Sequence, residues 1–157
     1  LVFNVLYFTG AIPPLPLALK EAGVYHSVVR VKDDYVLSAE QVPWYKRYLL
    51  YNTTFHRSAG EVAHVFTAIY TPRGLQALIM HQWQRKDVSG EWVTESVVPF
   101  TISGGRDEGY RGYSSKSALS AGEWRVNVLT KSGQVIGRVN FSVVVAQESP
   151  KLVEIRR

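Results

Sequence analysis

The stretch GEWRVNVLTKSGQVIGRVNFSVVV, residues 122–145, decides the fold. Residues 122–130 predict one strand, Lys131-Ser132-Gly133-Gln134 supplies turn chemistry, and residues 135–145 predict the strand that returns. In the returning strand Val139, Phe141 and Val143 share one face, whereas Arg138, Asn140 and Ser142 share the other. One face is therefore expected to be core and the other mostly solvated.

The same pattern continues upstream. A hairpin is expected from residues 24–31 through Lys32-Asp33-Asp34 into residues 35–37. Further strands are expected at residues 62–71, 75–85, 91–102 and 111–118, with turn residues between them. The short links imply antiparallel neighbours. About eight strands predict an all-β, antiparallel immunoglobulin-like β-sandwich, with a closed barrel as the alternative.

Three segments interrupt this pattern. Residues 52–60 read as a polar break and residues 147–157 as a loosely held tail. Residues 40–51 contain an aromatic cluster that suits either a short amphipathic helix or a loop laid on the core. We therefore expect a membrane-proximal apolar segment at 1–22, a sandwich domain at 23–146 and a tail at 147–157.

The first 19 residues carry no charged side chain. Pro13, Pro14 and Pro16 cannot continue a helix, so this segment is expected to be either the exit turn of a transmembrane helix or an apolar arm packed on the domain. A secretory signal is disfavoured because no basic region precedes the apolar run, and a start without Met suggests a fragment.

Composition excludes several classes of site. The chain of 157 residues has 18 Lys and Arg against 13 Asp and Glu, a net charge of +5, but the basic residues are scattered and do not form the stripe of a nucleic-acid binder. No nucleic-acid partner is expected. Cysteine is absent, which excludes disulfides, thiolate zinc sites and cysteine nucleophiles.

No catalytic or metal site is predicted. The four histidines stand on separate segments without metal-ligand spacing, and neither a nucleophile elbow nor a phosphate-binding glycine loop is present. Ser114 and Lys116 share a strand face but lie too far apart for a nucleophile and its base. No cofactor is therefore expected.

Polar and aromatic side chains of the predicted strands remain as candidates for ligand binding. Tryptophans on such strands are typically core residues, and arginines are typically solvated or paired charges. They would form a site only if they line one polar surface patch. The candidates are His81, Trp83, Arg111, Ser114, Lys116, Trp124 and Arg125.

The order of these residues resembles a known family. His81-x-Trp83, Arg111-x-x-Ser114-x-Lys116 and Gly122-x-Trp124-Arg125-Val126, followed by Ser132-Gly133 and Ile136-Gly137 and ending at Phe141, resemble the bacterial domain of unknown function 2914. The similarity is strong over residues 75–146. A looser similarity over residues 4–26 resembles the region that joins this domain to transmembrane helices in multi-pass members.

The resemblance implies a β-domain at the C-terminal end of a bacterial inner-membrane protein, on its periplasmic face. It brings no established activity or cofactor. We expect a non-enzymatic binding or interaction module, attached to the membrane through its N-terminal segment, with a glycan or an envelope protein as partner. One alternative is an enzyme acting on envelope carbohydrate or lipid, with His81 and Arg111 or Lys116 around a cleft. The other is a structural subunit of a membrane complex.

Overall fold

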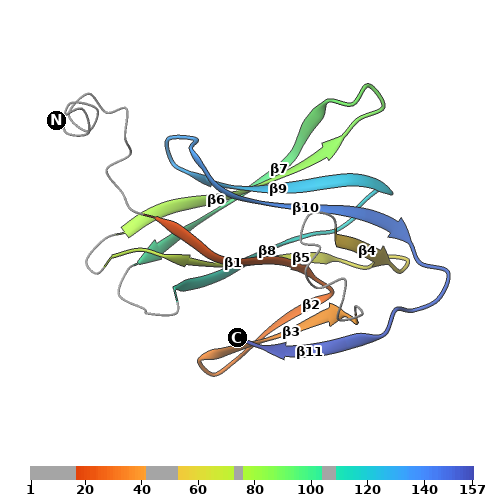
Figure 1. The fold of residues 1–157 in the computed structure, drawn as a ribbon, viewed down its shortest axis with the longest axis horizontal. Helices are drawn as coiled ribbons and strands as arrows, with labels where there is room; N and C mark the ends of the chain where they lie inside the picture. The colour runs from red at the N-terminus through yellow and green to blue at the C-terminus, as the bar shows by residue number, and fades with distance from the viewer. Residues whose placement is uncertain (1–16, 42–52, 73–75, 104–108) are drawn as a thin grey trace.

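The fold is built from strands throughout the described part of the chain. The computed structural model describes residues 17–41, 53–72, 76–103 and 109–157 (Figure 1). Their strands are β1 (Ala18–Tyr25), β2 (Ser27–Val31), β3 (Asp34–Glu40), β4 (Thr53–Arg57), β5 (Ala63–Tyr70), β6 (Gln76–Lys86), β7 (Trp92–Ser103), β8 (Tyr110–Lys116), β9 (Gly122–Thr130), β10 (Val135–Val145) and β11 (Leu152–Arg156).

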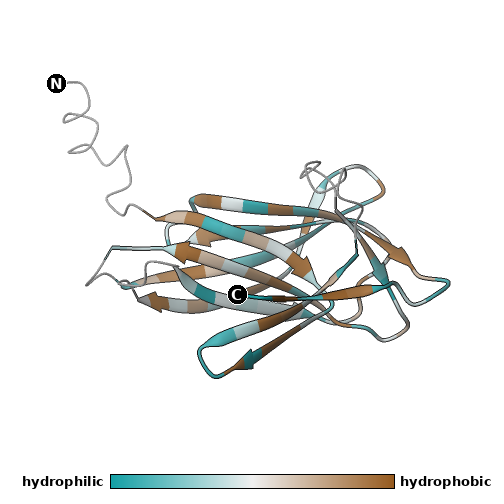
Figure 2. Ribbon diagram, turned by 60° about the horizontal axis from the view of Figure 1, so that its bottom comes forward, coloured by the Kyte–Doolittle hydropathy of each residue, from teal (hydrophilic) through white to brown (hydrophobic). Residues whose placement is uncertain are grey.

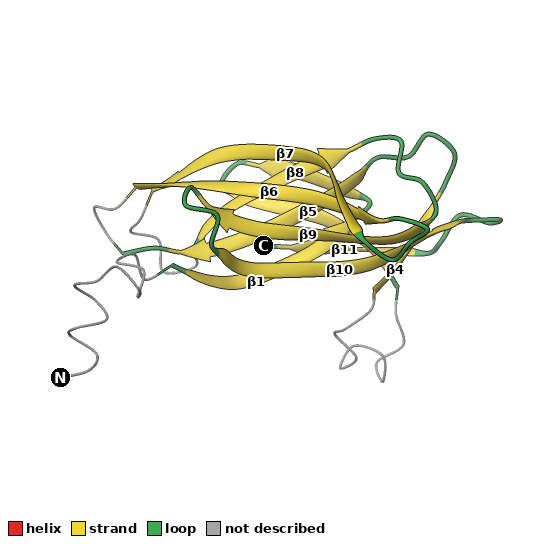
Figure 3. Ribbon diagram, turned by 90° about the horizontal axis from the view of Figure 1, so that it is seen from above, coloured by secondary structure: helices red, strands yellow, loops and turns green. Residues whose placement is uncertain are grey.

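The strands form three sheets. A five-stranded sheet has the order β4-β10-β9-β6-β7, a middle sheet has the order β1-β5-β8, and a third sheet has the order β11-β3-β2. Figure 3 shows the five-stranded sheet lying over the middle sheet, and Figure 1 shows the third sheet on the opposite side of the middle sheet. Among these strands only the β10–β4 pair is parallel. The all-β, immunoglobulin-like sandwich expected from the sequence is confirmed.

The main core lies between the five-stranded and middle sheets. Val139, Phe141 and Val143 of β10 are buried there, which confirms the predicted inward face of this strand. On β6 the inward face is the one that carries Ile79, His81 and Trp83. Figure 2 shows the alternation of apolar and polar residues along the strands that this two-sided environment produces.

The middle sheet is covered on both faces. On β5, Val65 and Ile69 pack toward the five-stranded sheet, whereas Phe66 packs against Tyr25, Val28 and Leu37 in a second core beneath the third sheet. The expectation of one wet face is wrong for β5, because a strand in a central layer is buried on both faces. Its sequence accordingly reads as a nearly continuous apolar run.

Both ends of the domain differ from the expectation. Residues 18–22 belong to β1, which pairs with β5, and the predicted tail contains β11, which pairs with β3. The predicted polar break contains β4, because Phe55 anchors residues 53–57 alongside β10 with 2% of its surface exposed. The apolar segment 1–16 and the aromatic cluster of residues 44–51 lie outside the described residues. Within the described ranges, no helix has the length and apolar character needed to cross a membrane.

Candidate functional site

Three of the predicted site residues meet inside the core. His81 on β6 lies with Nδ1 2.7 Å from Ser114 Oγ on β8 and with Nε2 3.0 Å from Thr67 Oγ1 on β5. Trp83 Nε1 donates to the same Ser114 Oγ at 3.0 Å. His81 and Trp83 are fully buried, and burial lowers the pKa of His81 to about 4, so the imidazole is neutral. This cluster joins the five-stranded sheet to the middle sheet.

Trp124 is a second internal residue of the candidate set. Its side chain is 2% exposed, its Nε1 donates to the Ser120 carbonyl at 2.9 Å, and Lys116 Nζ lies 5.9 Å from its ring centroid. The expected polar patch containing His81 and Ser114 does not form, because both side chains are buried between two sheets. Strand alternation alone could not decide which face of β6 is inward.

Arg111 and Arg125 lie in two other places. Arg111 on β8 pairs with Ala68 of β5 and contacts Asp33, Asp34 and Tyr35 of the β2–β3 hairpin, on the face of the middle sheet away from His81. Arg125 on β9 lies on the outer face of the five-stranded sheet. Four of the seven candidates are therefore buried in the core, namely His81, Trp83, Ser114 and Trp124. Lys116 is half-buried over Trp124, Arg111 is largely enclosed beneath the third sheet, and Arg125 lies on the outer face of the five-stranded sheet.

The outer face of the five-stranded sheet carries a network of side-chain amides and guanidinium groups, which we call the polar ladder. At its centre Asn127 Nδ2 donates to Gln82 Oε1 at 3.0 Å and to Gln84 Oε1 at 2.9 Å. Arg125 Nε donates to Gln84 Oε1 at 2.7 Å, and Arg138 Nε donates to Asn127 Oδ1 at 2.6 Å. The ladder residues are Gln82, Gln84, Arg125, Asn127 and Arg138.

Strand register produces this ladder. Gln84 stands opposite Arg125, and Gln82 stands opposite Asn127, which in turn stands opposite Arg138 on β10. Thr94 on β7 extends the network, since Gln82 and Gln84 donate to its Oγ1 at 3.2 and 3.1 Å. The polar groups are thus fixed in a plane across four strands.

An aromatic residue borders the ladder. Trp92 at the start of β7 is half-buried, and the guanidinium carbon of Arg125 lies 4.3 Å from its ring centroid. Lys86 Nζ lies 5.8 Å from the same ring. The cation–π contact holds the Arg125 side chain flat against the sheet. Sequence analysis included Arg125 as a candidate but missed Trp92 and the amides.

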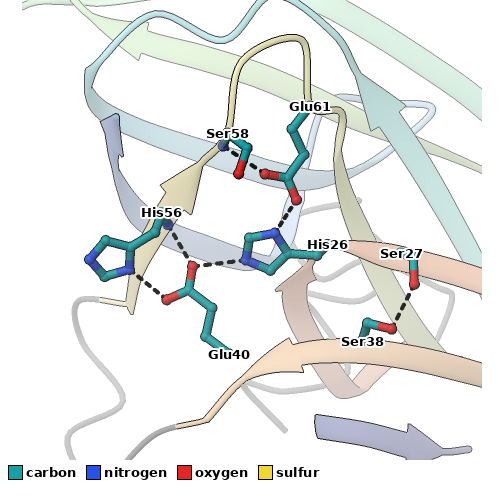
Figure 4. Close-up of polar contacts among 7 residues, drawn as sticks. All are labelled: His26, Ser27, Ser38, Glu40, His56, Ser58 and Glu61. Carbon is teal, nitrogen blue, oxygen red and sulfur yellow. Dashed lines mark hydrogen bonds and ion pairs between the residues drawn. The ribbon is translucent and has the colours of Figure 1, made fainter. Parts of the chain in front are cut away.

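A second polar cluster joins the β1–β2 junction, β3, β4 and the β4–β5 turn (Figure 4). Nε2 of His26 lies 2.8 Å from Glu40 Oε1, and Nδ1 of His26 forms a hydrogen bond with a carboxylate oxygen of Glu61. Glu40 also accepts from the His56 backbone N–H at 2.5 Å, and its Oε2 lies 2.7 Å from His56 Nδ1. His26 stacks on Phe55 with a centroid distance of 4.2 Å.

The charge state of this cluster follows from its geometry. Burial opposes charging of His26, but the hydrogen bonds to Glu40 and Glu61 outweigh it and raise the pKa of His26. Burial likewise disfavours the ionised form of Glu40. The hydrogen bonds from His26 and His56 favour that form more strongly, so the pKa of Glu40 is lowered. A histidine with a carboxylate on each ring nitrogen donates twice, so it is an imidazolium.

The cluster was not predicted, because its hydrogen-bonded pairs are 14 to 35 residues apart and no local motif brings them together. Within the parts of the chain that the structure describes, no group of His, Cys, Asp and Glu side chains could hold a metal ion. The contacts of His26, Glu40 and His56 form an ion-pair clamp between the third sheet and β4.

Comparison with solved structures gives low similarity in both sequence and fold. An immunoglobulin-like protein from Pseudomonas aeruginosa is similar at 8% identity and a TM-score of 0.42, covering 82% of this chain and 96% of that one. A DNA glycosylase for alkylpurines from Pseudomonas fluorescens has 12% identity and a TM-score of 0.40, covering 90% and 34%. A β-glucosidase from Listeria innocua has 13% identity and a TM-score of 0.40, covering 83% and 16%.

The chain thus spans about a third of the glycosylase and a smaller share of the glucosidase. No curated protein matches the chain in sequence. The segment that runs from the first residue of β6 into β10 contains the buried residues His81, Trp83 and Ser114. It also contains all five residues of the polar ladder. This segment, residues 76–143, matches the family described as "Protein of unknown function (DUF2914)".

Proposed function

We propose that this chain is a non-enzymatic binding module of a bacterial membrane protein, located on the periplasmic side of the inner membrane, and that its polar ladder binds a glycan. The observation that carries the proposal is the planar array formed by Gln82, Gln84, Arg125 and Arg138 around the buried amide of Asn127. An envelope protein is the other partner class, and the test below separates the two.

The chemistry of the ladder suits sugar hydroxyl groups. Amides offer both donors and acceptors, and guanidinium groups offer five donors in a rigid fork. Only Nε of Arg125 and Arg138 takes part in the ladder, which leaves their terminal N–H groups to donate to a ligand. Trp92 adds apolar surface beside these donors, as sites with a few placed polar groups require.

The ladder is also preorganised. Its side chains hold one another through bonds of 2.6–3.2 Å, so binding orders few additional rotamers. The sheet beneath is fixed by the buried His81–Ser114–Trp83 cluster. Rigid, satisfied polar groups on a sheet face are better suited to recognition than to chemistry, which needs groups of shifted pKa at an open site.

The enzyme alternative requires His81 to converge with Arg111 or Lys116 around a cleft. His81 instead projects from the five-stranded sheet onto one face of the middle sheet, whereas Arg111 lies on the opposite face of the middle sheet, toward the third sheet. The middle sheet therefore lies between them. Lys116 lies over the buried Trp124 ring. This arrangement favours the binding proposal over the enzyme. Membrane attachment rests on the apolar sequence before residue 17 and on the family resemblance.

The test is binding of the full chain to an array of bacterial envelope glycans, repeated with Gln84→Ala. Gln84 is the residue that Arg125, Asn127 and Thr94 all contact, so its loss should disorder the ladder and reduce glycan retention about tenfold or more. Gln134→Ala is the matched control, because Gln134 is exposed in the β9–β10 turn.

Three outcomes contradict the proposal. The first is no retained glycan on the array, and the second is equal retention by the wild type and Gln84→Ala. The third is crosslinking of the ladder to an envelope protein in cells when no glycan binds, which would assign the surface to a protein partner instead.

A further inference from the structure

We propose that a cavity between the middle and third sheets binds a carboxylate-bearing small molecule through Arg111, Arg156 and Arg157. The cavity has a volume of about 470 Å³ and is lined by Glu21, Asp34, Ala68, Arg111, Arg156 and Arg157. It lies on the face of the middle sheet away from the polar ladder, so this proposal is independent of the glycan proposal.

The cavity arises from one row of the middle sheet. Glu21 on β1 stands opposite Ala68 on β5, which stands opposite Arg111 on β8. Because alanine is small, the centre of this row is hollow, and the longer side chains of the row form two of its walls. A volume of this size accommodates a molecule of the size of a monosaccharide or small organic acid.

The third sheet closes the other side. Asp34 is the first residue of β3, and Arg156 is the last residue of β11. Arg157 continues this edge, since its backbone N–H donates to the Tyr35 carbonyl at 2.9 Å and its carbonyl accepts from Tyr35 N–H at 2.7 Å. Two arginines are thereby brought to the cavity by backbone pairing of a segment that sequence analysis interpreted as a tail.

Arg111 is the residue that points to a ligand. Its side chain is only 8% exposed, and its guanidinium carbon lies 5.4 Å from the Tyr35 ring centroid. Nη2 donates to the Asp33 carbonyl, and Nη1 lies 4.0 Å from Asp34 Oδ1. Its Nε is buried, and no hydrogen-bond partner for it lies within the described part of the chain. A buried unpaired donor costs about 1–3 kcal/mol, so the protein contacts of Arg111 leave part of its hydrogen-bonding capacity unused.

The other two arginines are more exposed than Arg111. Arg156 Nε lies 3.5 Å from Asp34 Oδ2 with 68% of the side chain exposed, and Arg157 Nε lies 2.7 Å from Glu21 Oε1 with 46% exposed. Exposed ion pairs of this kind contribute little, so both side chains can reorient toward a ligand at small cost. Arg111 is thus the fixed element and the other two are adjustable.

Charge balance selects the ligand class. Three guanidinium groups and two carboxylates line the cavity, so the lining side chains sum to +1 (3 − 2 = 1). A single carboxylate neutralises this excess and matches the guanidinium fork with two parallel hydrogen bonds. A phosphate dianion would reverse the sign of the site beside Glu21 and Asp34.

The experiment titrates the full chain with four probes at constant ionic strength, followed by NMR of the arginine side chains. The probes are acetate, glucuronate, neutral glucose and inorganic phosphate. Acetate and glucuronate should shift the Arg111 resonance, and glucose should not. Binding by both carboxylates identifies a simple carboxylate site, whereas binding by glucuronate alone identifies a carboxylate on a sugar ring; either result supports the proposal.

Variants locate the binding. Arg111→Gln should weaken the carboxylate affinity at least tenfold, because it removes the charge and the fork. Arg156→Gln replaces an exposed residue whose loss spares the fold, and it should weaken the affinity several-fold. Arg85→Gln is the matched control, since Arg85 forms an ion pair of 3.0 Å with Glu95 on β7, outside the cavity.

The proposal is overturned if neither carboxylate binds, if phosphate binds more tightly than both, or if Arg156→Gln and Arg85→Gln have the same affinity. Loss of glycan retention by Gln84→Ala with intact carboxylate binding would leave both proposals standing. The converse pattern, a silent glycan array with carboxylate binding that depends on Arg111, would remove only the glycan proposal.

Discussion

The buried His81 should make the fold sensitive to mild acid. Its imidazole is enclosed by Ser114, Thr67 and the edge of the Phe100 ring, and its pKa is lowered to about 4 from 6.5 by burial. The unfolded chain therefore binds a proton at a higher pH than the native chain does. Stability from this group is complete above pH 6.5 and is lost as the pH falls toward the folded value.

The size of the effect follows from the two pKa values. Between pH 7.5 and pH 4.5, a histidine with pKa 6.5 unfolded and about 4 folded loses about 2.5 kcal/mol of its contribution to the free energy of unfolding. Other groups titrate in this range, and His26 acts with the opposite sign because its pKa is raised. The quantity that isolates His81 is the difference between the wild type and His81→Asn.

Urea unfolding followed by tryptophan fluorescence measures this difference, since Trp83 and Trp124 are buried. The wild type should exceed His81→Asn by about 2.5 kcal/mol more at pH 7.5 than at pH 4.5. His64→Asn is the comparison variant, because His64 is half-buried on β5 and bonds Ser115 outside the core. Burial also lowers the pKa of His64, so its difference from the wild type should change with pH in the same direction but by less than that of His81→Asn. A difference between the wild type and His81→Asn that stays constant from pH 7.5 to pH 4.5 would refute the assignment of a neutral, acid-labile core histidine.

Three further predictions follow from single contacts. Ser114→Ala should lower the free energy of unfolding by about 1–3 kcal/mol, because Trp83 Nε1 loses its acceptor, whereas Ser115→Ala on the exposed face should cost less. Glu40→Gln should lower the pKa of His26 in an NMR titration, since it removes one carboxylate. Stability from His26 is lost as the pH rises through its raised folded pKa, and stability from Glu40 is lost as the pH falls through its lowered folded pKa, so the variant should lose most at mildly acidic pH, where both groups are charged. An unchanged His26 titration would contradict the clamp. Gly109→Ala should cost about 1–3 kcal/mol more than Gly60→Ala in urea unfolding: both residues have positive φ, but a Cβ at Gly109 meets the Ile69 backbone at 3.1 Å and one at Gly60 meets nothing within 4 Å.

Two-residue periodicity predicted the two faces of β10 correctly and those of the central strand β5 incorrectly. The inward face of β10 was predicted because that strand has one buried and one solvated face. β5 is buried on both faces, so its sequence is apolar at nearly every position. Such a run does not show which face is inward, and it does not indicate that a third sheet covers the other face. The third sheet in turn depends on β11, whose Val153 and Glu154 are exposed and whose sequence resembles a polar tail.

The candidate residues show why a motif does not separate fold from function. His81 and Trp83 are two residues apart on one face, and that face proved to be the core. The polar ladder uses the opposite face of the same strand, through Gln82 and Gln84, which carry no signal of their own in the sequence. Their role depends on register with β9, and register is a long-range property of the folded sheet.

The two proposed sites are built from different segments of the chain. Residues 76–143, which match the family, contain every ladder residue, and they contain Arg111 but neither of the other two cavity arginines. The cavity also needs Glu21 and Asp34 from the strands that precede this segment. All residues that would bind a ligand of the ladder therefore lie within the segment from β6 to β10. Binding of a ligand in the cavity also requires β1, β3 and β11 to be folded. Carboxylate binding should accordingly stabilise the third sheet against local opening, which amide hydrogen exchange of residues 34–40 measures with and without glucuronate.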